Sequence, residues 1–138
     1  MNGGITQLTA HANVGEFALM WSWTAGESEV AFAMLAPRTI AQRSCEVGLM
    51  IDGVRPPFPE PQFGGAGGLS GYRANISLET LRGMSVGARV VGRMCTSEWR
   101  LDQPAQAVVQ ELVNRIAEEG AWASDAPSDT ETPANPGP

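Results

Sequence analysis

The clearest pattern in the chain is an alternation of apolar and polar residues between positions 15 and 35. Such alternation has a period of two and predicts half-buried β-strands. The polar break TAGESE separates two alternating runs, and Gly26 supplies the positive φ that a tight turn needs. We therefore predict a hairpin whose second strand ends at Pro37, because proline cannot donate to a ladder. Its buried side chains are expected to be Phe17, Leu19, Trp21, Trp23, Val30, Phe32 and Met34.

A third strand is predicted over residues 44–51, SCEVGLMI, where apolar residues again fall at alternate positions. The expected buried face consists of Cys45, Val47, Leu49 and Ile51. Asp52 and Gly53, which follow, are the preferred central pair of a type I′ turn. Val54 then begins a short return strand before the next prolines stop it.

Residues 55–71, RPPFPEPQFGGAGGLSG, interrupt this regular pattern with four prolines and five glycines. Proline fixes the backbone in an extended, polyproline-like conformation, whereas glycine leaves it free. We predict a stiff arm from Arg55 to Phe63, followed by a flexible glycine run to Gly71. Because long connections without internal structure are uncommon in compact domains, this arm is the first candidate for a functional element.

Beyond the arm, residues 72–78 alternate again and predict a strand. A short helical turn should follow, with Ser77 as its N-cap and Gly83 just past its end. The next strand is predicted over residues 86–95, and residues 97–101 either extend that strand or pair with it.

One amphipathic helix is predicted over residues 103–119. Asp102 is the expected N-cap, Pro104 lies in the first turn where no amide donor is needed, and Gly120 ends the helix. The apolar stripe contains Ala105, Val108, Val109, Leu112, Val113 and Ile116. The opposite face, expected to be solvated, contains Gln106, Gln110, Glu111, Asn114, Arg115 and Glu118.

Together these elements predict a mainly β (α+β) protein. The expected architecture is an antiparallel β-sandwich or partly open barrel of five to seven strands, with the C-terminal amphipathic helix packed on it. The length of 138 residues fits one domain, which we place at residues 1–120. Residues 121–138 are acidic and rich in proline, alanine and serine, a composition typical of a disordered tail.

The charges bear on partners and location. All nine basic residues are arginines, against fifteen acids, and they are scattered along the chain rather than gathered in a stripe. This argues against nucleic acid as a partner, and arginine without lysine is typical of a GC-rich, and we expect bacterial, genome. There is no run of about 20 apolar residues, so no membrane span is predicted. The N-terminal residues lack the pattern of a signal peptide, and we expect a soluble cytoplasmic protein.

The cysteines, Cys45 and Cys95, are fifty residues apart. In a reducing cytosol two buried free thiols are the default, and we favour them here, although in an exported protein a disulfide between strands would be plausible. With a single histidine, His11, the chain offers no close pair of metal ligands. We therefore predict no metal site and no cofactor.

Catalytic motifs are also missing. Without lysine there is neither a Walker phosphate loop nor a Schiff-base residue. The run GAGGLS has Ser70 where a dinucleotide-binding fingerprint needs glycine, and GLSGY has Tyr72 where the nucleophile elbow needs glycine. No catalytic residue is predicted, and the sequence favours binding over catalysis.

The leading hypothesis is a small protein-interaction or assembly module that engages an unidentified protein partner through the arm. The candidate partner-binding residues are Arg55, Phe58, Pro59, Pro61, Phe63 and Tyr72. In the simpler interpretation, the two phenylalanines merely fold back on the sheet as a plug. The alternative function is a ligand-binding barrel, with the glycine-rich loop as a lid over a pocket lined by Trp21, Trp23 or Trp99. The oligomeric state is left open.

Overall fold

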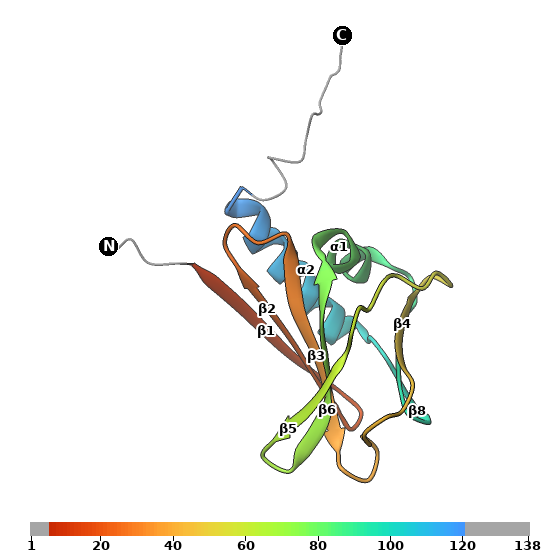
Figure 1. Ribbon diagram of the computed structural model, residues 1–138. Coiled ribbons are helices and arrows are strands. Elements are labelled where there is room, and N and C mark those ends of the chain that lie inside the picture. The colour runs from red at the N-terminus through yellow and green to blue at the C-terminus, as the bar shows by residue number, and fades with distance from the viewer. Residues whose placement is uncertain (1–5, 121–138) are drawn as a thin grey trace.

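The computed structural model describes residues 6–120 as two antiparallel sheets and two helices (Figure 1). The large sheet has the strand order β1-β2-β3-β6-β5, and the small sheet has the order β4-β7-β8. The strands of the large sheet are β1 (Gln7–Val14), β2 (Phe17–Thr24), β3 (Glu29–Pro37), β5 (Gln62–Ala66) and β6 (Leu69–Ser77). The remaining elements are β4 (Val47–Ile51), α1 (Leu78–Val86), β7 (Val90–Met94), β8 (Ser97–Arg100) and α2 (Gln103–Glu118).

The predicted fold class is confirmed, since the protein is mainly antiparallel β with the C-terminal helix packed on the sheets. The sheets remain open and do not close into a barrel. Residues 6–120 contain eight strands rather than five to seven, because β1 and β5 were not predicted. The predicted tail, residues 121–138, lies outside the described residues and stays a prediction.

The hairpin of β2 and β3 follows the predicted alternation. All seven predicted inward-facing side chains are buried, at no more than 5% exposure. Gly26 has a φ of 94° in the turn, and β3 ends at Pro37 as predicted. The period-two pattern therefore predicted correctly which side chains of β2 and β3 face the core.

The core lies on one side of the large sheet. Figure 1 shows both helices and the small sheet on that side. Helix α2 buries one stripe of its predicted apolar residues against this core: Ala105, Val109, Leu112 and Ile116. As predicted, Asp102 caps the helix, its Oδ1 accepting a hydrogen bond from the Ala105 amide at 2.9 Å, and Gly120 follows the last turn with a φ of 88°.

Helix α1 begins as predicted but ends later. Ser77 is its N-cap and accepts a hydrogen bond from the Thr80 amide at 3.0 Å. The helix continues through Gly83 to Val86, so the next strand begins only at Val90. A Cβ at Gly83 would lie 3.4 Å from Ile51 Cδ1, which shows how closely the helix packs on β4 there. Gly83 is therefore a packing residue inside the helix and not its stop signal.

Two residues of the α2 face that was expected to be solvated instead bind α1. Gln106 Nε2 donates hydrogen bonds to the carbonyls of Met84 and Gly87, at 3.0 and 2.8 Å. Gln110 Nε2 donates to the Ser85 carbonyl at 2.9 Å. Carbonyls at a helix C-terminus lack hydrogen-bond donors within the helix, and these two glutamines provide the missing donors.

In the small sheet, β8 pairs with β7, which settles the choice that the sequence left open. Trp99 is 3% exposed, and its indole lies directly on Gly92 of β7, its cross-strand partner. A Cβ at Gly92 would overlap the ring. The glycine in the strand interior thus marks a close approach by another group.

Candidate functional site

The proline-rich segment of residues 55–61, which we call the strap, starts from a rigid turn. Asp52 and Gly53 have φ values of 50° and 83°, as the predicted type I′ turn requires, and Val54 bridges back to Ile51. The Asp52 carboxylate accepts a hydrogen bond from the Arg89 amide at 2.7 Å. The strap therefore leaves the small sheet from a fixed position and crosses to the large sheet (Figure 1).

Phe58 anchors the middle of the strap. Its ring is half-buried and meets the ring of Phe32 edge-on, with the centroids 6.2 Å apart. Phe32 is fully buried and also contacts Trp21 and Trp99, at centroid distances of 5.3 and 6.1 Å. The strap is thus fastened to an aromatic cluster that joins the two sheets.

The glycine run after the strap is not the flexible loop that was predicted. Its first part is β5, and it turns through Gly67 and Gly68, whose φ values of 60° and 84° fit a two-residue type I′ hairpin. Gly71, in β6, lies against the backbone carbonyl of Met34, where a Cβ would overlap it. These glycines serve a tight turn and a close strand approach, so the prediction of a freely moving run was wrong.

Phe63 in β5 faces the interior and not the solvent. Its half-buried ring meets Tyr72 edge-on at 5.2 Å, and the Arg43 guanidinium lies 4.9 Å from its centroid. Tyr72 is 5% exposed. Of the six candidate partner-binding residues, Arg55, Pro59 and Pro61 are exposed, whereas Phe58, Phe63 and Tyr72 pack inward.

Cys45 and Cys95 form a disulfide, so the prediction of free thiols was wrong. Cys45 precedes β4 and Cys95 follows β7, and the pairing of these two strands brings the cysteines together across fifty residues. Pairing between distant strands leaves no local trace in the sequence, which is why spacing alone could not predict the bond.

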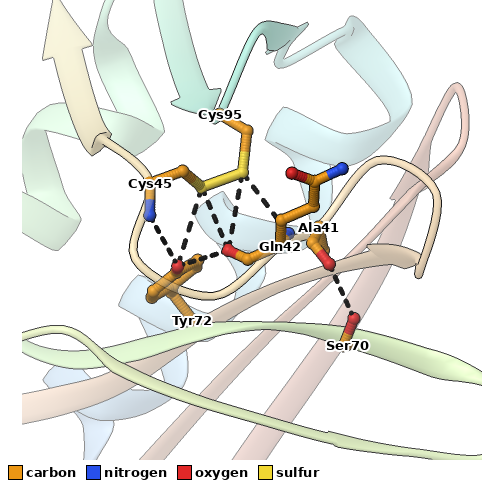
Figure 2. The surroundings of a disulfide bond; sticks show 6 residues. All are labelled: Ala41, Gln42, Cys45, Ser70, Tyr72 and Cys95. Atoms are coloured by element: carbon orange, nitrogen blue, oxygen red, sulfur yellow. Dashed lines mark hydrogen bonds between the residues drawn. A yellow bond between two sulfur atoms is a disulfide. The ribbon is translucent and has the colours of Figure 1, made fainter.

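Figure 2 shows how the disulfide is joined to the large sheet. Tyr72 Oη donates a hydrogen bond to the Gln42 carbonyl at 2.5 Å and accepts one from the Cys45 amide at 3.2 Å. The Gln42 carbonyl also lies 3.1 Å from Cys45 Sγ. A disulfide sulfur carries no proton, so this last approach is a contact and not a hydrogen bond. The disulfide and Tyr72 together hold the loop before β4 against β6.

A groove opens where β5 stops short of its partner. Strand β6 continues to Ser77, but β5 pairs with it only as far as Arg73. There the chain diverges, because the strap prolines cannot donate to a ladder and Glu60 has a φ of 46°. The resulting cavity of about 280 Å³, the edge groove, is lined by Glu29, Pro59, Glu60, Gln62, Arg73, Ala74 and Asn75.

The edge groove lies beside a stretch of β6 that has no strand partner on that side. On its β3 side, β6 is paired along its whole length, but residues 74–77 have no β5 partner on the other side. Unpaired edge N–H and C=O groups are a template for an added strand. The groove is also polar, since Glu29, Glu60 and Arg73 contribute charged side chains to its wall.

Comparison with protein-family models, curated proteins and solved structures gave no match. In residues 6–120, no helix is long and apolar enough to cross a membrane. The same residues contain no group of three or more histidine, cysteine or acidic side chains placed to hold a metal ion. His11 lies exposed on β1. A proposal for the function therefore rests on the geometry of the described residues.

The three tryptophans of the alternative ligand pocket are core residues. Trp21, Trp23 and Trp99 are exposed by only 1, 2 and 3%. Trp23 Nε1 donates a hydrogen bond to the Glu27 carbonyl at 2.9 Å, whereas the indole N–H groups of Trp21 and Trp99 are buried without a partner. The glycine loop that was to serve as their lid is the turn of the β5–β6 hairpin. A ligand site at these indoles stays a prediction.

Proposed function

We propose that the protein is a non-enzymatic interaction module that binds an extended segment of a protein partner in the edge groove. The segment adds as a strand beside residues 74–77 of β6, in line with β5. The observation that carries this proposal is the length mismatch between β6 and β5 at a cavity lined by the strap. Main-chain pairing of this kind supplies affinity, and side chains along the groove supply selectivity.

The strap supports this function as a preformed wall. Pro59 and Glu60 line the groove, and Phe58 next to them is packed on Phe32, so the wall is held before a partner arrives. A wall fixed in advance lowers the entropy that binding would otherwise lose. The left-handed conformation of Glu60 is unfavourable for a non-glycine residue, and backbone strain of this kind is concentrated at functional positions.

The charges of the groove indicate which segments it prefers. Glu29 and Glu60 face one cation, Arg73, and the whole chain has a formal charge of −6. A segment with a basic side chain is therefore favoured over an acidic one, both at encounter and in the bound state. We expect an extended, uncapped peptide stretch with at least one arginine or lysine.

The disulfide bears on where the module works. Structural disulfides persist in oxidising compartments and are rare in the cytosol. We therefore expect the protein to act in an oxidising compartment rather than in the cytoplasm that the sequence suggested.

A displayed library of random decapeptides, selected against the oxidised protein, tests the proposed function. Selected peptides should share a basic residue, and their affinity should fall about tenfold in the Glu29→Lys/Glu60→Lys variant. The control is Glu16→Lys, which reverses an exposed charge in the β1–β2 turn and should leave binding unchanged. Selected peptides that bind the double variant and the wild type equally would refute the assignment to the groove.

A further inference from the structure

A second cavity lies on the outer face of the small sheet, away from the core. Cross-strand pairing puts Gly48 of β4 opposite Arg93 of β7, and Arg93 opposite Glu98 of β8. In the next outward-facing row, Met50 lies opposite Val91. The cavity, which we call the outer cavity, has a volume of about 80 Å³.

Gly48 creates the space in this cavity. A Cβ built at Gly48 would have no heavy atom within 4 Å, so any larger residue would project into open space there. Met50 and Val91 are half-buried and give the cavity an apolar lining. A water takes up about 30 Å³ in the liquid, so the cavity holds roughly three groups of that size. This matches a short aliphatic side chain.

Two arginines lie beside the apolar lining of the outer cavity. Arg55 and Arg93 line the cavity and are exposed, and within residues 6–120 neither has an ion pair with a carboxylate. The backbone of Arg93 is fixed by the pairing of β7 on both sides, and Arg55 lies two residues after Gly53 of the rigid turn. Unpaired guanidinium groups on fixed backbone are suited to binding a carboxylate through two parallel hydrogen bonds.

Glu46 and Glu98 also line the cavity and are exposed. Carboxylates accept hydrogen bonds only, so they complement an N–H donor on the ligand. The arginines can bind a carboxylate, the glutamates can accept a hydrogen bond from an N–H, and a small apolar lining lies between them. These three features match the groups of a C-terminal amino-acid residue.

We propose that the outer cavity binds an N-acylated small aliphatic amino acid with a free carboxylate, either as the last residue of a peptide or as a free small molecule. The carboxylate binds Arg55 and Arg93, the side chain contacts Met50 and Val91, and the N–H points to the glutamates. This site is separate from the edge groove, so either proposal can fail without the other.

The test uses N-acetyl-valine, N-acetyl-valinamide and a pentapeptide ending in valine with a free carboxylate, each titrated into isotope-labelled oxidised protein. We expect the free acids to shift the amide resonances of Gly48 and Val91, and the capped amide to bind at least about tenfold more weakly. A peptide that binds much more tightly than N-acetyl-valine identifies a peptide terminus as the natural ligand, and equal affinities identify the small molecule.

Three variants assign the binding to the cavity. Arg93→Gln should weaken the free acids about tenfold, and Gly48→Leu should abolish binding by filling the space, with both variants keeping the wild-type melting temperature. Arg115→Gln, which removes an exposed arginine from α2, is the matched control and should bind normally. Equal binding of acid and amide, resonance shifts elsewhere in the protein, or no binding of either acid at millimolar concentration would overturn the proposal.

Discussion

Replacing both cysteines by serine tests how strongly the disulfide stabilises the fold. The bond closes a loop across a sequence separation of 50 residues. In the loop-closure model, a loop of that length removes about 14 cal/mol/K of entropy from the unfolded chain, which is about 4 kcal/mol at 25 °C. Both cysteines are only half-buried, so serine itself adds little further cost.

The assay is reversible unfolding in denaturant and by heat. We expect the Cys45→Ser/Cys95→Ser variant to lose about 4 kcal/mol of unfolding free energy, with its melting temperature lower by roughly 15 °C. Wild-type protein treated with a reductant should melt close to the variant, and the reductant should leave the variant unchanged. Typical domains are stable by about 5 to 15 kcal/mol, so this loss is a large share of the total.

Two results would contradict this role of the disulfide: a loss of less than about 1 kcal/mol in the double variant, or a wild-type melting temperature that reduction leaves unchanged. Either result would mean that the loop before β4 is held by its contacts with Tyr72 rather than by the bond. A Tyr72→Phe variant separates these contributions, because it removes the hydrogen bonds to Gln42 and Cys45 while keeping the ring against Phe63.

Three further substitutions, the first with a matched control, test the packing and the strap, each measured by denaturant unfolding. Gly92→Ala should destabilise the protein by about 1 to 3 kcal/mol, because the new Cβ overlaps the Trp99 ring, whereas Gly48→Ala in the same sheet should be near neutral. Leu112→Ala should cost about 2 to 5 kcal/mol, since this side chain is 2% exposed in the core, and a smaller loss would mean that α2 is loosely docked. Glu60→Gly should stabilise the protein by roughly 0.5 to 1 kcal/mol by relieving the left-handed backbone, and a loss of stability would contradict that interpretation.

The parts of the fold that sequence reasoning predicted correctly are those with local signals. The β2–β3 hairpin follows from alternation over adjacent positions, and the Asp52–Gly53 turn from the preferences of two neighbouring residues. Helix α2 carries its apolar stripe, its N-cap and its final glycine within one continuous stretch. Each of these signals lies within a short continuous stretch of sequence, so it can be recognised without knowledge of the tertiary structure.

The missed elements lack such local signals. β1 alternates only weakly, because its inward-facing side chains include two alanines at positions 10 and 12. β5 contains Gly64 and Gly65, which have no side chains to form a pattern. The disulfide depends on the pairing of β4 with β7, far apart in the sequence. Each of these features depends on which strands become neighbours in the sheets, and the composition of a strand does not determine its neighbours.

The candidate site could be predicted only in part for the same reason. The strap prolines marked the correct region, and Pro59 does line the edge groove. The groove itself arises because β6 extends beyond the end of β5. The strap sequence does not indicate where β5 ends relative to β6. The leading hypothesis displayed Phe58 and Phe63 to a partner. They instead pack against Phe32 and Tyr72, as in the simpler interpretation, because burying an aromatic ring is more favourable than exposing it.

Amide hydrogen exchange along β6, with and without a selected basic peptide, tests the central claim most directly. In the free protein, the groove-facing amides within residues 74–77 should exchange quickly, while those that pair with β3 or β5 stay protected. Added peptide should slow the exchange of these groove-facing amides. Binding that leaves their exchange unchanged, or protection of these amides in the free protein, would contradict the account of an open strand edge that a partner completes.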